Sequence, residues 1–161
     1  MPDAAPLSPP VEIRLGWLDE AVAYHLRLAQ AASFQAFAEL AGETGLRPGR
    51  YAVLQLIRDN PGVGQTALSR AAGRDKTTLT PMLNDLERHG LITRTPHPTD
   101  RRGRMLRLTE AGEVARARLA DCAERHDARL DALLGGKDKA ELIRMLRLIT
   151  TALDRDPTQE D

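Results

Sequence analysis

Residues 77–109, TTLTPMLNDLERHGLITRTPHPTDRRGRMLRLT, predict a helix, a glycine turn and two short strands joined by an arginine-rich turn. One apolar stripe at helical spacing consists of Leu79, Leu83 and Leu86. After Gly90 the period changes, because Leu106 and Leu108 recur at every second residue, as in a strand with one buried face. A helix beside an arginine-tipped hairpin is the geometry of a winged helix-turn-helix, in which the helix suits the major groove of DNA and the hairpin suits the minor groove or the backbone.

Polar side chains of this segment are the candidates for DNA contacts. Hydroxyl and amide groups pair with base edges, and the expected base-reading residues are Thr77, Thr78, Thr80 and Asn84. Lys76 and Arg88 are expected to contact phosphates, which position a protein without specifying a sequence. The turn between the strands contains Asp100, Arg101, Arg102, Gly103 and Arg104. The alternative is a solvated charged surface, above all for Thr78, but a glycine at the tip favours a built turn.

Two stretches resemble the MarR family of bacterial transcription regulators. DRRGRMLRLTEAG, residues 100–112, is similar to that family's wing-to-helix signature, in which Asp-x-Arg precedes a strand and then Leu-Thr-x-x-Gly. LNDLERHGLITR, residues 83–94, is similar to the exit of its recognition helix. The resemblance covers roughly residues 15–153. It implies that Arg102 enters the groove, that Asp100 orients it through a charge-assisted bond, and that Arg101 and Arg104 add backbone affinity.

Composition favours a mostly α-helical chain of one domain, because the apolar residues are largely Ala and Leu and only 3% of residues are aromatic. The formal net charge is zero, yet residues 70–107 hold nine basic and four acidic residues, a net charge of +5. A basic block in a neutral chain is what a local DNA footprint requires. The single cysteine, Cys122, excludes an internal disulfide. With no secretion signal and no membrane span, we expect a soluble cytoplasmic protein.

The N-terminal third predicts an arm and a long helix. Residues 1–12 hold four of the ten prolines and predict a flexible arm. Residues 15–40 predict one helix whose apolar side chains lie on nearly opposite sides: Leu15, Val22, Leu26, Phe37 and Leu40 on one, and Trp17, Tyr24 and Leu28 on the other. Such wide apolar surface indicates two burials, one within the subunit and one against another chain. A helix central to a monomer is the alternative.

The middle of the chain predicts three helices. Residues 48–60 form the first, and residues 65–72 form the short first helix of the helix-turn-helix, with Leu68 and Ala71 buried and Gly73 in the turn. A phosphate-binding loop is rejected here, because Gln65 stands where that motif needs lysine. Asp75 can cap a recognition helix that begins at Lys76. Thr80-Pro81 is a competing start, but the phase of the leucine stripe favours the earlier one.

After the hairpin, a helix is expected from Thr109 to about residue 134, ended by Gly135-Gly136. A last helix is expected after the capping-box pattern Asp138-x-x-Glu141, with a stripe of Leu142, Met145, Leu146, Ile149 and Leu153. The predicted fold is therefore mostly α, a winged helix-turn-helix lobe at residues 48–108 with a small β-hairpin wing, and a helical dimerisation region at residues 13–47 and 109–161. The family resemblance implies that these helices interlock in a homodimer, and two recognition helices related by a dyad can read a palindromic operator in double-stranded DNA.

The favoured function is a dimeric, sequence-specific DNA-binding transcriptional regulator, a repressor that a small ligand modulates. The resemblance implies an aromatic ligand, and YHLRLAQ, residues 24–30, is similar to a subgroup that senses hydroxycinnamate-type acids or their coenzyme A thioesters. The candidate ligand residues are Trp17, Tyr24, His25, Arg27 and Tyr51. The alternative function is a small-molecule-binding or protein-interaction helical module without DNA function. No cofactor and no metal are expected, since the histidines lack ligand spacing, and no residue pattern supports catalysis.

Overall fold

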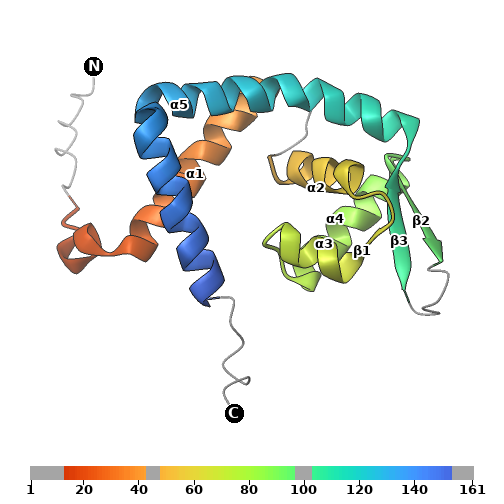
Figure 1. Cartoon of the computed structure of the whole chain (residues 1–161), viewed down its shortest axis with the longest axis horizontal. Coiled ribbons are helices and arrows are strands. Elements are labelled where there is room, and N and C mark those ends of the chain that lie inside the picture. The colour runs from red at the N-terminus through yellow and green to blue at the C-terminus, as the bar shows by residue number, and fades with distance from the viewer. Residues whose placement is uncertain (1–12, 43–47, 97–102, 154–161) are drawn as a thin grey trace, which may run out of the picture.

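The computed structural model describes residues 13–42, 48–96 and 103–153, and the predicted N-terminal arm lies outside these residues. A helix-rich lobe is formed by α2 (Pro48–Asp59), α3 (Gln65–Ala71), α4 (Lys76–Arg88) and three strands. In Figure 1 the first half of the long helix α5 (Glu110–Leu153) runs along the top, and the lobe lies beneath the N-terminal end of this half. The second half of α5 runs down from the opposite end, on the same side of the picture as α1 (Val22–Ala41). The mostly helical winged fold expected from the sequence is confirmed.

The strands form one antiparallel sheet of order β1-β3-β2, built from β1 (Val63–Gly64), β2 (Ile92–Pro96) and β3 (Arg104–Leu108). The hairpin register pairs Ile92 with Leu108 and Pro96 with Arg104. The sequence predicted β2 and β3 as the hairpin. It missed β1, which pairs with the opposite edge of β3 through only two residues, too few to show a period.

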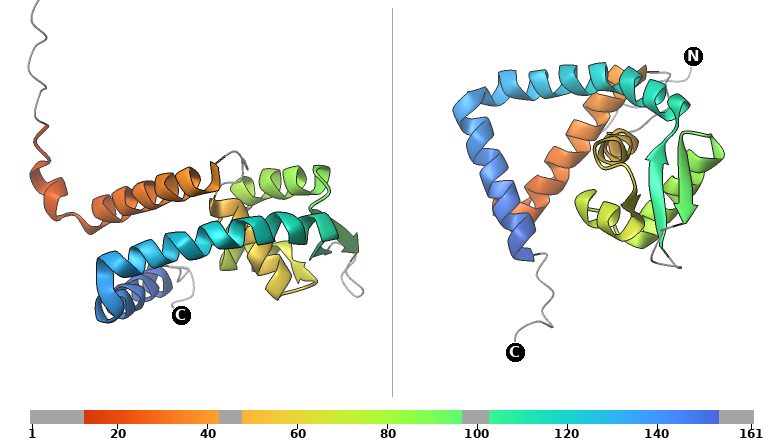
Figure 2. Two further views of the ribbon diagram at one scale, coloured as in Figure 1. Left: turned by 90° about the horizontal axis from the view of Figure 1, so that it is seen from above. Right: turned by 45° about the vertical axis from the view of Figure 1, so that its right-hand side comes forward.

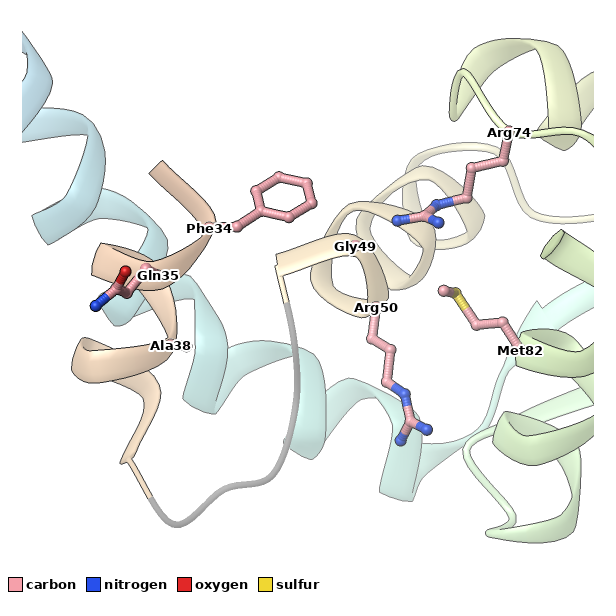
Figure 3. A pocket seen from close by; sticks show the side chains of 7 residues that line it. All are labelled: Phe34, Gln35, Ala38, Gly49, Arg50, Arg74 and Met82. Atoms are coloured by element: carbon pink, nitrogen blue, oxygen red, sulfur yellow. The ribbon is translucent and has the colours of Figure 1, made fainter. Parts of the chain in front are cut away.

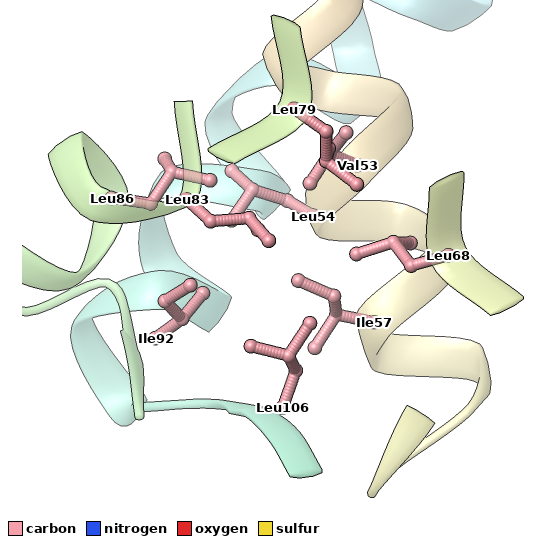
Figure 4. Close-up of a cluster of buried hydrophobic side chains, with 9 residues drawn as sticks. All are labelled: Val53, Leu54, Ile57, Leu68, Leu79, Leu83, Leu86, Ile92 and Leu106. Atoms are coloured by element: carbon pink, nitrogen blue, oxygen red, sulfur yellow. The ribbon is translucent and has the colours of Figure 1, made fainter. Parts of the chain in front are cut away.

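One buried cluster fills the space between the helices of the lobe and the sheet (Figure 4). Side chains from α2, α3, α4, β2 and β3 converge there, and its members are Val53, Leu54, Ile57, Leu68, Leu79, Leu83, Leu86, Ile92 and Leu106. The expectation that Ala71 is buried is wrong: Ala71 is exposed, and Ala72 packs on the cluster instead. Ala72 follows buried Leu68 by four residues and so continues the packed face at helical spacing, whereas Ala71 is turned to the solvent side.

The helix α4 begins at Lys76 with Asp75 as its N-cap, so the earlier of the two predicted starts is confirmed. The cap carboxylate accepts a hydrogen bond from the backbone N–H of Thr78 at 2.7 Å. Pro81 stands inside the helix, where its missing N–H removes one backbone hydrogen bond. The helix continues through Pro81 because Leu79, Leu83 and Leu86 are all buried in the cluster on its opposite side.

The first helix differs from the prediction. Residues 15–40 do not form one helix: a 3-10 helix, η1 (Gly16–Glu20), precedes α1, and Ala21 between them is extended, with φ −82° and ψ 110°. Within the chain only the end of α1 is buried. Phe37 and Ala41 form a second cluster with Leu119 and Cys122 of α5.

The long helix α5 bends sharply, as both views of Figure 2 show, and the bend lies at Gly135, where φ is 69° and ψ is 163°. A left-handed φ of this kind favours glycine. The predicted end of the helix at Gly135-Gly136 is confirmed, because Gly135 interrupts the helical geometry. The predicted start of the last helix at Asp138 is wrong, because the helix resumes directly after Gly135. Lys139, beyond the bend, lies 2.9 Å from an Asp127 carboxylate oxygen and 2.5 Å from an Asp131 carboxylate oxygen. These ion pairs join the two halves of α5.

Large apolar side chains are exposed outside the lobe. They lie between residues 13 and 22, a stretch that includes η1 and the start of α1, and on α5 both before and after its bend, and they include Ile13, Trp17, Val22, Leu133, Met145, Leu148 and Leu153. Within residues 13–42, 48–96 and 103–153, no helix combines the length and the apolar character needed to cross a membrane.

Candidate nucleic-acid interface

The solvent face of α4 lies opposite its buried leucines. At 100° per residue, Thr77, Asn84 and Arg88 project within a narrow sector that also contains Pro81, and all four residues are exposed. This face presents a hydroxyl, an amide and a guanidinium, the groups that suit base edges and phosphates. The predicted base-reading and phosphate-contacting residues of α4 thus divide into three that share this face and three that flank it: Lys76, Thr78 and Thr80.

Asp75 organises the first turn of α4. Its carboxylate accepts hydrogen bonds from the Thr77 hydroxyl at 2.6 Å and from the Thr78 hydroxyl at 3.2 Å, in addition to the Thr78 backbone N–H. These bonds, that of Thr77 first, lower the pKa of Asp75 from 3.8 to about 2. Because each hydroxyl proton points back to Asp75, the outward side of Thr77 offers its oxygen lone pairs and its methyl group.

Thr80 is held differently, since its hydroxyl oxygen accepts a hydrogen bond from Gln65 Nε2 of α3 at 2.7 Å. This contact is partly buried and ties α4 to the preceding helix. Thr80 therefore lies at the edge of the exposed face rather than at its centre. Lys76 is exposed at the first turn of α4, where an ammonium group can reach a phosphate.

An ion-pair cluster holds the C-terminal part of α4 against α2. The Asp85 carboxylate lies 2.5 Å from the Arg50 guanidinium of α2, and it also pairs with Arg88 of its own helix. Arg50 and Asp85 are largely covered, whereas the Arg88 side chain is 74% exposed. Arg88 is therefore free to exchange a carboxylate for a phosphate, while the Arg50–Asp85 pair fixes the position of the helix.

The hairpin is anchored to the start of α5 by the Leu-Thr-x-x-Gly segment. The Thr109 hydroxyl donates to the Gly90 carbonyl at 2.6 Å and accepts from the Gly112 N–H at 3.0 Å, and the Thr109 N–H donates to the Leu91 carbonyl at 3.1 Å. Gly112 is buried against Leu91 so closely that a Cβ would overlap the Leu91 carbonyl oxygen. This packing gives a physical reason for the glycine in the motif.

The tip of the hairpin includes three of the predicted contact residues, Asp100, Arg101 and Arg102, which lie outside the described residues. Arg104, the fourth, is exposed at the first position of β3, opposite Pro96. Arg94 was not predicted as a site residue. Its guanidinium, on β2, donates to the Asn84 side-chain oxygen of α4 at 2.8 Å. Only the pairing of the hairpin with α4 reveals this contact.

A pocket of about 560 Å³ lies between α1 and the lobe (Figure 3). Its lining residues come from α1, α2, the turn before α4, and α4: Phe34, Gln35, Ala38, Gly49, Arg50, Arg74 and Met82. Among the described residues, no carboxylate pairs with Arg74, and its guanidinium lies directly over Gly49. The pocket thus combines apolar walls with a cationic group.

The predicted ligand residues do not gather in this pocket. Arg27 lies over the Tyr24 ring at 5.5 Å, and the Tyr24 and His25 rings are 5.6 Å apart, so these three form a group at the start of α1. Trp17 lies on η1 and is 78% exposed. Tyr51 instead packs on Phe37, with ring centroids 6.3 Å apart. Phe37 follows Tyr24 by 13 residues, roughly 20 Å along a helix, so Tyr51 lies far from the other candidates within one chain.

The helix α4, the hairpin and the buried lobe define a protein of the winged helix-turn-helix DNA-binding class. The MarR family model matches residues 46–103. The putative transcriptional regulatory protein for the hcr operon of Thauera aromatica is 39% identical over 125 residues, 77% of this chain and 75% of that protein. A structure of the transcriptional repressor CouR bound to a 23-mer DNA duplex shares 36% identity and has a TM-score of 0.76, over 86% of this chain and 99% of that chain. CouR bound to p-coumaroyl-CoA shares 34% identity, with a TM-score of 0.76 over 86% of this chain and 97% of that chain.

The chain belongs to the MarR family of transcriptional regulators. This membership confirms the family resemblance drawn from residues 83–94 and 100–112, and it confirms the expectation that the chain is a regulator and not an enzyme.

Proposed function

We propose that this chain is a homodimeric repressor that binds a palindromic operator and is released by an aromatic carboxylate or its coenzyme A thioester. The observation that carries the DNA half of the proposal is the exposed face of α4, where Thr77, Asn84 and Arg88 project together beside the hairpin. In this assignment α4 enters the major groove. The hairpin, with Arg104 and the arginines of its tip, contacts the backbone or the minor groove.

The exposed apolar side chains support the homodimer. Trp17 and Val22 near one end of the chain and Leu148 and Leu153 near the other are all more than half exposed, and none of them belongs to the lobe. A second copy of the same helices would cover them, and the two α4 helices would then be related by a dyad. Because the target is genomic DNA, we assign the protein to the cytoplasm.

The pocket is the first candidate ligand site. A flat acyl group fits between Phe34 and Met82, and Arg74 supplies the cation that a carboxylate or a phosphate needs. The relative CouR has been seen with p-coumaroyl-CoA. A bound ligand could alter the position of α4, because two lining residues of the pocket connect to this helix. Met82 belongs to α4, and Arg50 lies 2.5 Å from the Asp85 carboxylate of α4. A ligand that draws Arg50 away from Asp85 would release the C-terminal half of the helix.

The second candidate ligand site is the group of Trp17, Tyr24, His25 and Arg27. These residues lie in or shortly after the exposed apolar stretch of residues 13–22, where a partner subunit would close them off. The two candidate sites are distinguished by which substitution abolishes the ligand response. Arg74→Met should abolish the response to p-coumaroyl-CoA if the pocket is the site, and Arg27→Met should do so if the start of α1 is the site. Tyr51 completes neither site within one chain.

The experiment is a fluorescence anisotropy titration of a palindromic duplex taken from upstream of the chain's own gene. Binding should weaken as salt rises, with a slope of roughly 0.9 log units per phosphate contact. Arg88→Ala should reduce that slope by roughly 0.9 per subunit, while Arg144→Ala, an exposed residue of α5 paired with Glu141, serves as the matched control and should leave it unchanged. A monomer in sedimentation, or no binding of any duplex at low ionic strength, would contradict the proposal.

A further inference from the structure

A contact between β2 and α4 orients Asn84, one of the residues expected to read bases. Arg94, on β2, places one terminal nitrogen 2.8 Å from Asn84 Oδ1 and the other 3.4 Å from a Glu87 carboxylate oxygen. The Arg94 side chain is only 20% exposed. Its Nε is buried, with no hydrogen-bond partner among the described residues. Because a buried unpaired N–H destabilises the fold, this position is not explained by hydrogen bonding within the lobe alone.

The chemistry of the two side chains fixes the orientation of the amide. A guanidinium has only donors, so the Asn84 atom that meets Arg94 has to be the oxygen. The amide nitrogen of Asn84, with its two hydrogens, then lies on the side away from Arg94. Asn84 itself is exposed and lies on the face of α4 that also contains Thr77 and Arg88. An unheld asparagine could turn either its oxygen or its nitrogen outward, whereas Asn84 is held in one of these states.

We propose that Arg94 is a positioning residue that makes Asn84 present amide N–H donors to the operator, so that Asn84 selects bases with acceptor atoms and rejects the N4 amino donor of cytosine. The acceptors in the major groove are guanine O6 and N7, adenine N7 and thymine O4. The inference rests on the proposed function, since it requires α4 to lie in the major groove. It goes further in two respects: it states that Asn84 contacts its base through hydrogen-bond donors, and it states that Arg94, a residue outside α4, sets this orientation.

The test is a base-preference matrix measured by competition binding on the palindromic operator, with all four bases at each position of a half-site. The position read by Asn84 is the one at which Asn84→Ala erases discrimination. There the wild-type protein should disfavour cytosine on the contacted strand by roughly five- to a hundredfold. Arg94→Met keeps the side-chain stem and removes the donors, so this penalty should fall to about the level of Asn84→Ala. Preferences at other positions should persist.

Arg94→Lys provides the rescue, because an ammonium group still donates to the Asn84 oxygen, and it should restore most of the cytosine penalty. A merely structural Arg94 predicts something else: Arg94→Met would lower affinity by the same factor for all four bases, and that result overturns the proposal. Should Arg94→Met fail to fold by circular dichroism, the wild-type protein decides. If cytosine is preferred at the Asn84 position, or if binding of adenine there depends on its N6 amino group when tested with a purine analogue, the proposal is wrong.

These outcomes are distinct from failure of the proposed function. A wild-type chain that binds no duplex at low ionic strength refutes both the operator and the role of Arg94. A wild-type chain that binds its operator while Arg94→Met leaves the matrix unchanged refutes the role of Arg94 alone.

Discussion

Replacing Gly112 with alanine should loosen the junction between the hairpin and α5. The new Cβ would overlap the Leu91 carbonyl oxygen and would lie 3.0 Å from the Leu91 carbonyl carbon and 3.4 Å from a methyl group of Leu108. The first two neighbours are backbone atoms and cannot rotate away. The start of α5 must therefore withdraw, which weakens the Thr109 hydrogen bonds to Gly90 and Leu91 at 2.6 and 3.1 Å.

The magnitude follows from these contacts. Two lost hydrogen bonds contribute about 0.5–1.5 kcal/mol each. If the overlap is absorbed in place instead, it costs about 1–3 kcal/mol. Alanine recovers part of this loss, up to about 1 kcal/mol, through its better helix propensity. The free energy of unfolding should therefore fall by up to about 3 kcal/mol relative to the wild type, and by about 1–3 kcal/mol relative to a glycine-to-alanine change in the same helix that meets no neighbouring atom.

The assay is urea unfolding followed by circular dichroism, at one fixed protein concentration because the stability of a dimer depends on concentration. Gly136→Ala is the matched control: Gly136 lies in α5 with nothing within 4 Å of a built Cβ, so the variant should be neutral or more stable by about 0.5–1 kcal/mol. Operator affinity should fall in Gly112→Ala only, since the hairpin loses its anchor. If Gly112→Ala unfolds at the same urea midpoint as Gly136→Ala, the steric reasoning is refuted.

Three further predictions concern the core, the helix cap and the apolar surface. Leu83→Ala should reduce the free energy of unfolding by about 2–5 kcal/mol, because Leu83 is fully buried, whereas Leu153→Ala should leave it nearly unchanged within a monomer. Asp75 has a folded pKa of about 2, below the ordinary value of 3.8 for an aspartate, so its carboxylate stabilises the fold above about pH 4 and this contribution is lost as the pH falls toward 2. Asp75→Asn should therefore show a flatter decline of the urea midpoint between pH 5 and pH 2, and an identical decline would contradict the cap. Leu148→Asp should yield a monomer in sedimentation and lose operator binding, and a persistent dimer would place the interface elsewhere.

The lobe was predictable because its signals are local. The Asp75 cap, the spacing of Leu79, Leu83 and Leu86, and the alternation in β3 each depend on residues within a few positions of one another. The competing start at Thr80-Pro81 was resolved by the phase of the leucine stripe, and α4 does begin at Lys76. The sequence did not predict β1, which pairs with the edge of β3 opposite β2. Two residues form β1, and only tertiary pairing identifies it.

The pocket could not be predicted from sequence patterns, because its walls come from four separate parts of the chain. Phe34, Arg50, Arg74 and Met82 are ordinary residues in their own segments, and none shows a motif. The predicted ligand residues were chosen by side-chain type, and three of them do lie together at the start of α1. Tyr51 packs on Phe37 and lies apart from these three residues within one chain, a separation that side-chain type alone does not reveal.

The apolar side chains of the first helical segment are divided between buried and exposed positions. The sequence indicated a helix with two apolar sides, one for its own subunit and one for a partner. In the structure the division runs along the segment instead of around it: Phe37 and Ala41 are buried near its C-terminal end, while Trp17 and Val22 are exposed beyond the break at Ala21 or beside it. The bend at Gly135 turns the second half of α5 out of line with its first half (Figure 2), and Leu148 and Leu153 on this second half are exposed. The interruption at Gly135 was predicted from the sequence and the one at Ala21 was not, and both lie in the region proposed to meet a second copy. Exposed apolar side chains thus lie on two segments that are far apart in the sequence, and a symmetric partner that packs on both segments would cover them.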